Sequence, residues 1–376
     1  MKMEEFLRES KSALNKLDEF TKVKVILGNE TCDLDSAVCS LTHGLWHYDN
    51  LKNKNIQDVA VIPVLNIKKN ELKLKTEVVY LFNEHQVPLE LLTFRNEIDL
   101  SDLNKRQMLE LSLVDHHTLS DYDTSLADAV LEVIDHRPQD PNWMWTGRDV
   151  NLEKVGSCAT LIARNILEKN PKLLDFHISS LLRGPILIDT CNFSESAARA
   201  TPLDIKVTRE LEKIIDTCSS TKQDSKDEIY SRILSAKTDI GCLSSEDLLL
   251  KDLKFVNGIP IPGLPILVKE FLNLNGALEA VNAFTREREC CLTILLGMDL
   301  KENVAKRDLA VFSFLPNDLE NKITKALEES SVAKLSLLES TSKENWSLKL
   351  YKQENVRATR KQILPIIQSA SAGIQC

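Results

Sequence analysis

The sequence lacks several features that would place it in a large protein class. No apolar run approaches the roughly 18 residues of a membrane-spanning helix, and the opening MKMEEFLRES is acidic, unlike a secretory signal or a mitochondrial presequence. Its nine cysteines include no C-x-x-C pair, which argues against a disulfide framework and against a zinc knuckle. We therefore expect a cytoplasmic protein with reduced thiols and no membrane partner.

Excess basic charge and phosphate-binding glycine loops are also missing. The net charge of −9 argues against a broad surface for duplex nucleic acid, and neither G-x-x-x-x-G-K nor G-x-G-x-x-G occurs. An anionic substrate is still compatible with this balance, because two divalent cations add about four positive charges at one place.

The chain has the size and composition of a globular protein with two domains. Its 376 residues exceed the usual length of one domain, and 43% hydrophobic with 27% charged residues are ordinary values. Short apolar runs alternate with helical stretches in the first half, which predicts an α/β fold with a mostly parallel sheet. The predicted strands are residues 23–27, 59–64, 78–82, 109–114, 130–134 and 186–188.

A polar stretch without periodicity, residues 216–228, predicts an interdomain linker between domains at 1–215 and 229–376. The second domain is expected to be a smaller mixed α/β unit. Its predicted helices are 231–237, 272–284, 318–328 and 360–367, and its predicted strands are 265–268, 292–296 and 309–314.

The first cluster of chemically useful side chains is G-N-E-T-C-D-L-D-S, residues 28–36, between a predicted strand and a predicted helix at 37–45. Open parallel sheets bind ligands beyond the carboxyl ends of their strands, and the carboxylates of Asp33 and Asp35 suit magnesium or manganese. The alternative is that these aspartates cap the helix. Taken alone, the cluster favours capping.

Three further apolar runs end in acidic residues. Two of them lead into the triplets 115–117 (D-H-H) and 135–137 (D-H-R), and the third leads into Asp189. If the strands are neighbours, these side chains converge on one edge of the sheet. Two cations roughly 3.5 to 4 Å apart require such a set of converging carboxylates. This constellation favours His136 as a metal ligand. The histidines outside it, His43, His47, His85 and His177, are interpreted as packed or surface residues.

The order D-x-D-S, V-D-H-H, I-D-H-R and a terminal aspartate resembles the motifs of DHH superfamily phosphoesterases. With V-L-N-I-K (64–68), D-H-R-P (135–138) and V-G-S-C-A-T (155–160), the chain is similar to the prune and exopolyphosphatase branch. The segment T-R-K-Q-I-L-P (359–365) resembles the basic motif of the DHHA2 domain. The resemblance implies an N-terminal DHH domain, a C-terminal DHHA2 domain and an active site in the cleft between them.

The resemblance also implies two divalent cations, Mg²⁺ or Mn²⁺, as cofactors. The implied metal ligands are Asp33, Asp35, Asp115, His136 and Asp189, with Asp115 bridging the two ions. His116 and His117 are candidates for orienting Asp115 from outside the ligand set, and His116 is the one we select.

The implied substrate-binding residues are Asn29, Arg137, Arg199, Arg360 and Lys361. Asn29 stands where family II pyrophosphatases have a metal-binding histidine, and Arg137 stands where they have the second histidine of D-H-H. Because an arginine stays charged and can hold two phosphate oxygens, Arg137 favours binding over proton transfer. The alternative to substrate binding for Arg360 and Lys361 is that they are solvent-exposed residues in the first turn of a helix.

These observations predict a two-metal phosphohydrolase, with Asp115 and Arg137 as catalytic residues. Short polyphosphates are the first substrate prediction, while pyrophosphate and cyclic nucleotides stay open. An oligoribonuclease of the same superfamily is disfavoured, because no adjacent glycines supply its G-G-G-H type motif. The rival from another class is a weakly active regulatory scaffold, for which the resemblance implies nucleoside diphosphate kinase as a protein partner.

Overall fold

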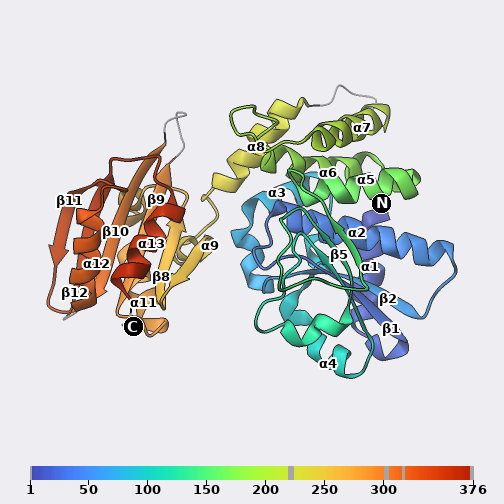
Figure 1. Ribbon diagram of the computed structural model, residues 1–376, viewed down its shortest axis with the longest axis horizontal. Helices are drawn as coiled ribbons and strands as arrows, with labels where there is room; N and C mark the ends of the chain where they lie inside the picture. Colours follow the sequence, from blue (N-terminus) through green and yellow to red (C-terminus); the bar gives the residue numbers. More distant parts are fainter. Residues whose placement is uncertain (1, 219–223, 300–304, 316–317, 373–376) are drawn as a thin grey trace. The chain divides into compact units, whose positions relative to one another are not determined.

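The computed structural model describes residues 2–218, 224–299, 305–315 and 318–372 (Figure 1). The chain divides into two compact units, Met1–Thr238 and Asp239–Cys376. None of the described helices is long and apolar enough to cross a membrane.

The first unit is built on a six-stranded parallel sheet in the order β3-β2-β1-β4-β5-β6. Its strands are β1 (Lys22–Leu27), β2 (Val59–Leu65), β3 (Thr93–Phe94), β4 (Leu109–Val114), β5 (Val130–Asp135) and β6 (Asp149–Leu152). The chain moves outward from β1 to β3 and then returns to β4 on the other side of β1. Open α/β sheets bind ligands at such a reversal point.

Helices cover both faces of this sheet, which explains why its strands read as continuous apolar runs. The helices of the unit are α1 (Lys2–Leu14), α2 (Leu34–Asn53), α3 (Thr76–Glu84), α4 (Leu100–Lys105), α5 (Cys158–Lys169), α6 (Phe176–Asp189), α7 (Pro202–Cys218) and α8 (Lys226–Thr238). One core joins Ile26, Val114 and Ile134 to α2, α5 and α6. Another core packs Val25 and Leu111 against α4, which lies on the opposite side of the sheet in Figure 1.

Two predicted strands of the first unit are wrong, because both runs are helical. Residues 78–82 lie within α3, and residues 186–188 form the end of α6. Helix α6 is buried continuously from Ile178 to Leu187, so it has no exposed polar face whose periodicity would reveal a helix. Asp189 is therefore the last residue of a helix and does not end a strand.

The second unit has a mixed sheet in the order β11-β12-β10-β9-β8-β7, in which β8 and β9 are parallel and the other neighbours antiparallel. The strands are β7 (Leu253–Val256), β8 (Ile259–Leu264), β9 (Leu292–Asp299), β10 (Lys306–Phe314), β11 (Leu335–Ser342) and β12 (Trp346–Gln353). This unit confirms the predicted mixed α/β class.

Helices cover both faces of the second sheet as well. Helices α9 (Ser245–Lys251), α10 (Val268–Leu272) and α11 (Ala277–Glu287) share one apolar core with it, and α12 (Asp318–Glu329) and α13 (Arg360–Ala370) share the other. The predicted strand at 265–268 is wrong, because β8 ends at Leu264 and α10 begins at Val268.

The predicted linker at 216–228 overlaps the end of α7 and the start of α8, and its residues 219–223 lie outside the described part of the chain. The two compact units divide after Thr238. Ile233 of α8 is fully buried in the core of the first unit, which places α8 with the N-terminal sheet.

The cysteines differ in one respect from the expectation. Seven of them are free in the described part of the chain, whereas Cys291 is disulfide-bonded. The expectation of reduced thiols throughout is therefore wrong for Cys291.

Candidate active site

The loop after β1 is held tightly against the first turn of α2. The hydroxyl of Ser36 accepts a hydrogen bond from the backbone N–H of Asn29 at 2.7 Å. A Cβ atom on Gly28 would lie 2.4 Å from that hydroxyl oxygen, so this position requires glycine. Asp33 caps α2 by accepting from the backbone N–H of Ser36 at 3.1 Å. The capping interpretation is thus correct for one oxygen of Asp33.

Asp35 is buried, with 3% of its surface exposed, and it faces the start of α5. Its carboxylate accepts the backbone N–H groups of Cys158 at 2.7 Å and Ala159 at 2.8 Å. A helix N-terminus stabilises negative charge through its free N–H groups and its dipole. This contact gives the motif V-G-S-C-A-T a role in positioning Asp35.

A second buried carboxylate fixes that segment in place. Asp204, which is fully buried, accepts the backbone N–H of Gly156 at 2.9 Å and the hydroxyl of Thr160 at 2.6 Å. It also accepts the backbone N–H of Thr201 at 2.7 Å. Asp204 therefore locks the start of α5, although nothing in the sequence marked it as part of the site.

Asp115 follows β4 in the left-handed backbone region, with φ of 58°. Aspartate tolerates this conformation better than most residues, and such strain is common at functional sites. Its carboxylate is 1% exposed. Asn29 Nδ2 donates to Oδ2 at 2.5 Å, Arg137 Nη1 donates to Oδ1 at 2.8 Å, and His136 Nε2 lies 3.4 Å from Oδ1. Three side chains from two other loops thus fix this carboxylate.

The ends of β1, β4 and β5 bring candidate metal ligands together. Asp35, Asp115 and His136 each offer a ligand atom, and these atoms lie within 4.8 Å of one another. The charge of Asp33 also acts on Asp35 and Asp115. These residues lie at the reversal point between β1 and β4, where the sequence predicted the crevice.

Asp189 reaches the same cluster from the end of α6. Its Oδ2 atom is buried without a hydrogen-bond partner among the described residues. Burial, followed by the charges of Asp35 and Asp33, raises the pKa of Asp189 well above its ordinary value. The residue was thus correctly placed near the other aspartates, although it lies on a different kind of element from the one predicted.

The cluster carries more negative charge than its surroundings compensate. Burial and the charge of Asp35 raise the pKa of Asp115 to about 7, and burial raises the pKa of Asp35 as well. Burial lowers the pKa of His136, but the hydrogen bond to Asp115 and the charge of Asp35 outweigh it and raise that pKa to about 9. Buried, mutually repelling carboxylates and the orphaned oxygen of Asp189 fit divalent cations with a preference for oxygen ligands.

Arg137 lies at the edge of this cluster, with 44% of its side chain exposed. Its Nη1 donates to Oδ1 of Asp115 and to Oδ1 of Asp135, both at 2.8 Å, and also to the backbone carbonyl of Asp115. Burial opposes the charged guanidinium, but the two carboxylates raise the pKa of Arg137 further above its ordinary value. The side chain is therefore a fixed positive charge beside Asp115.

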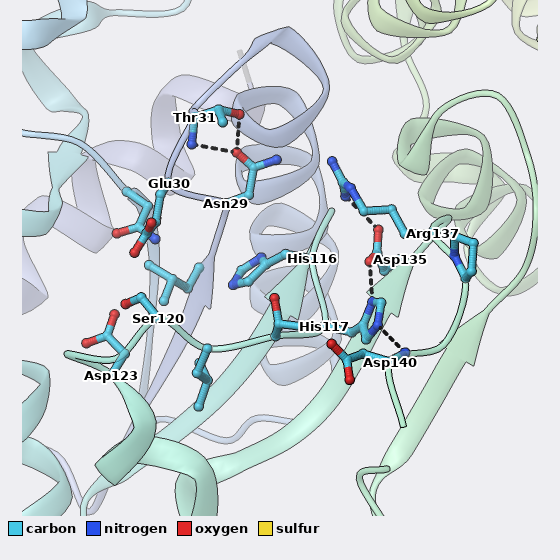
Figure 2. Close-up of a pocket in the computed structure, with 15 residues that line it drawn as sticks. Asn29, Glu30, Thr31, His116, His117, Ser120, Asp123, Asp135, Arg137 and Asp140 are labelled. Atoms are coloured by element: carbon cyan, nitrogen blue, oxygen red, sulfur yellow. Dashed lines mark hydrogen bonds and ion pairs between the residues drawn. The ribbon is translucent and has the colours of Figure 1, made fainter. Parts of the chain in front are cut away.

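A hollow of about 430 Å³ opens beside Arg137 (Figure 2). Its walls come from the loop after β1, from the segment after β4 and from the segment after β5. The polar lining residues are Asn29, Glu30, Thr31, Asn66, His116, His117, Thr118, Ser120, Asp123, Asp135, Arg137 and Asp140. The hollow can accommodate a small polar molecule next to the Asp115 cluster.

His117, which was expected with His116 to orient Asp115, supports the site through Asp135 instead. Its Nδ1 lies 2.6 Å from Oδ2 of Asp135, and its Nε2 accepts the backbone N–H of Asp140 at 2.9 Å. Because Nε2 accepts, Nδ1 carries the proton and donates to Asp135. His116 instead places its Nδ1 3.0 Å from the carbonyl of Val114. The triplet D-H-H was the available signal, but it did not distinguish its two histidines.

Three predicted substrate-binding residues lie outside this hollow. Arg199 is exposed in the segment between α6 and α7 of the first unit. Arg360 begins α13 in the second unit, where it forms a 2.9 Å ion pair with Asp252, and Lys361 is exposed beside it. That these three residues come close to the Asp115 cluster when substrate binds is still a prediction.

Comparison with known proteins gives two findings on the family. The profile of the DHHA2 domain matches residues 231–370. Exopolyphosphatase PRUNE1 of Homo sapiens is 34% identical over an aligned stretch of 376 residues, gaps included. The alignment covers 98% of this chain and 79% of that protein. The chain belongs to the PRUNE1 family. The resemblance to the prune branch, predicted from the motifs, is therefore confirmed.

More distant matches share less with this PRUNE1-family chain. Protein prune homolog 2 of Mus musculus is 27% identical over 87% of this chain, which corresponds to 10% of that protein. A Methanococcus jannaschii structure assigned to the family II inorganic pyrophosphatases covers 92% of this chain and 99% of its own, with 18% identity and a TM-score of 0.49.

Proposed function

We propose that this PRUNE1-family chain is a phosphohydrolase that cleaves phosphoanhydride bonds of short polyphosphates with two divalent cations bound. The observation that carries this proposal is the cluster of Asp35, Asp115, His136 and Asp189, in which buried carboxylates repel one another. Relatives named exopolyphosphatase support the same reaction class.

The residues that would hold the cations are Asp33, Asp35, Asp115, His136 and Asp189, with Asp115 shared between the two. When bound, such a pair supplies Lewis acidity and an activated water at neutral pH. Magnesium and manganese suit the carboxylate-rich set.

Three neighbouring groups position these ligands. The N-terminus of α5 fixes both oxygens of Asp35, while Asn29 and Arg137 fix the carboxylate of Asp115. Asn29 Oδ1 also accepts the backbone N–H groups of Thr31 and Cys32. Because both ends of the Asn29 amide are engaged, we assign it to orienting Asp115 and no longer to contacting substrate directly.

Arg137 is the cation that we expect to contact the terminal phosphate, since it lines the hollow beside Asp115. A guanidinium can hold two phosphate oxygens and neutralise charge that develops in the transition state. We propose that Arg199, Arg360 and Lys361 add positive charge for longer anions. Release of Arg360 from Asp252 would accompany that role.

The variant Arg137→His tests this assignment. A histidine can donate a proton to the leaving oxygen, which typically contributes 10² to 10⁴-fold in rate, whereas loss of the charged contact costs roughly 1.5 to 3 kcal/mol of binding. We expect kcat for pyrophosphate to rise and KM for tripolyphosphate to rise as well. Steady-state kinetics at fixed magnesium measure both, with calorimetry of metal binding as the control. An unchanged kcat would show that Arg137 lies away from the leaving group.

A regulatory scaffold that docks partners such as nucleoside diphosphate kinase is the alternative function. The contact that favours it is the one between Arg137 Nη1 and Asp115 Oδ1, because an arginine on that oxygen competes with a cation. Hydrolysis separates the two functions, measured as phosphate release from tripolyphosphate and pyrophosphate and as conversion of cyclic nucleotides to nucleoside monophosphates. We expect tripolyphosphate to be hydrolysed faster than pyrophosphate or cyclic nucleotides at equal concentration, and no hydrolysis of any of them would favour the scaffold.

A further inference from the structure

Two histidines of α2 and one glutamate of β5 meet on the face of the first sheet against which α2 packs. Nε2 of His43 lies 2.8 Å and Nε2 of His47 lies 2.9 Å from the same oxygen of Glu132, Oε2. The two Nε2 atoms are 3.1 Å apart. Three strong ligand atoms thus form a nearly equilateral triangle, and the sequence interpretation of these histidines as packed or surface residues does not account for it.

This cluster is separate from the Asp115 cluster. His43 follows Asp35 by eight residues on α2, which is roughly 12 Å along a helix. Glu132 precedes Asp135 by three residues on β5, which is roughly 10 Å along a strand. None of the three residues serves the phosphohydrolase proposed above.

Hydrogen bonding alone explains this arrangement poorly. Two ring N–H groups would have to converge on one carboxylate oxygen while their nitrogens stay in contact distance of each other. A single cation replaces both protons at once. A tetrahedral ion with bonds of ~2.0–2.1 Å separates its ligand atoms by roughly 3.3 Å, so the triangle needs to open by only a few tenths of an ångström.

The surroundings hold the ligands and leave one side accessible. His43 has 2% of its side chain exposed and stacks on Trp46 with ring centroids 5.4 Å apart. His47 and Glu132 keep 16% and 15% of their side chains exposed, which leaves room for a fourth ligand from solvent. The i, i+4 spacing places both imidazoles on one face of α2, as in helical metal-binding motifs.

The local charges also suit a metal ion. Glu132 brings one negative charge to the two imidazoles, while Lys24, a nearby cation, forms a 3.1 Å ion pair with Glu110.

We propose that His43, His47 and Glu132 bind one transition-metal cation of the zinc class. Imidazole nitrogens select such ions over magnesium, and two histidines with one glutamate plus an open fourth position form a known type of zinc site. The ion would tie α2 to β5, the two elements that carry Asp35 and Asp135.

Cobalt is the probe for this site, because four-coordinate Co²⁺ is coloured and replaces zinc. The full chain, stripped of metal, is titrated with Co²⁺ in a large excess of Mg²⁺, which competes for the oxygen ligands of the carboxylate-rich cluster. We expect one equivalent of Co²⁺ with the intense visible absorption of a four-coordinate ion. His47→Gln and Glu132→Gln are each expected to weaken cobalt binding by at least about tenfold. Changing a residue that only supports a metal ligand already costs about 10- to 100-fold in metal affinity, so loss of a ligand should cost at least the lower value.

The matched control is His177→Gln. His177 also lies near another histidine, His85, with ring centroids 5.8 Å apart, and the pair is not among the candidate metal-binding groups of the described residues. Its variant is expected to keep the cobalt equivalent. A wild-type chain without an intensely absorbing, magnesium-resistant cobalt equivalent overturns the proposal, as does such an absorbing equivalent that survives in both His47→Gln and Glu132→Gln.

Discussion

Replacing Asp115 with asparagine is expected to lower kcat for tripolyphosphate by more than about 100-fold. Residues that only support metal ligands already contribute 10- to 100-fold, and Asp115 is the proposed shared ligand itself. Asparagine keeps the size of the side chain and tolerates the φ of 58° at this position. The loss would therefore come from the missing negative charge. Phosphate release at saturating magnesium measures it.

The control for this variant is Asp149→Asn, which removes an exposed carboxylate from β6 of the same sheet. It is expected to keep wild-type kcat, and both variants should melt within a few degrees of the wild type in magnesium. Near-normal turnover of Asp115→Asn with saturating metal would rule out Asp115 as the shared ligand.

Asp189→Asn is expected to stabilise the protein without divalent cations and to weaken its stabilisation by them. The neutral amide removes the cost of burying a carboxyl group beside Asp35 and Asp33, whose charges add to burial in raising the pKa of Asp189. A gain of about 1 kcal/mol corresponds to a Tm increase of roughly 2–4 °C for a domain of this size. Manganese should then raise the Tm of the wild type more than that of the variant, because the variant has lost a ligand.

The sign of the pH dependence follows from the raised pKa. A carboxyl whose pKa is higher in the folded state binds its proton more tightly there, so it contributes stability at low pH that is lost as pH rises through the folded value. For Asp115 that value is about 7. The metal-free wild type should therefore lose stability between about pH 4 and pH 7, and the advantage of Asp189→Asn should be larger at pH 8 than at pH 5.

Asp204→Asn provides the contrasting control, because Asp204 is buried and accepts hydrogen bonds from Gly156 and Thr160. This variant should melt lower than the wild type with and without manganese. Scanning calorimetry in chelator and in manganese measures all three proteins. A lower metal-free Tm for Asp189→Asn, or an undiminished response to manganese, would contradict the proposed cation site.

The sequence predicted the strand ends of the candidate site because each one combines an apolar run with polar residues at its carboxyl end. Asp35, Asp115 and His136 were found in this way, and the structure brings them together. Asp189 was predicted at the end of a strand, but it lies at the end of helix α6. A short apolar run has no periodicity that distinguishes a buried strand from a buried helix.

The residues that sequence reasoning missed act through tertiary contacts. The backbone of Cys158 binds Asp35 from 123 residues away, and Asp204 holds the neighbouring loop from α7. No local pattern reveals such partners. His43 and His47 have a spacing that was visible in the sequence, but their relation to Glu132 depends on how α2 packs against β5.

The most direct test of the account is the initial rate of phosphate release from tripolyphosphate by the full chain. We predict release that requires Mg²⁺ or Mn²⁺, stops on addition of a chelator, returns when the cation is restored, and falls by more than about 100-fold in Asp115→Asn. A wild-type rate that matches that of Asp115→Asn at saturating cation, or one that persists in chelator, would contradict the proposed metal-dependent phosphohydrolase.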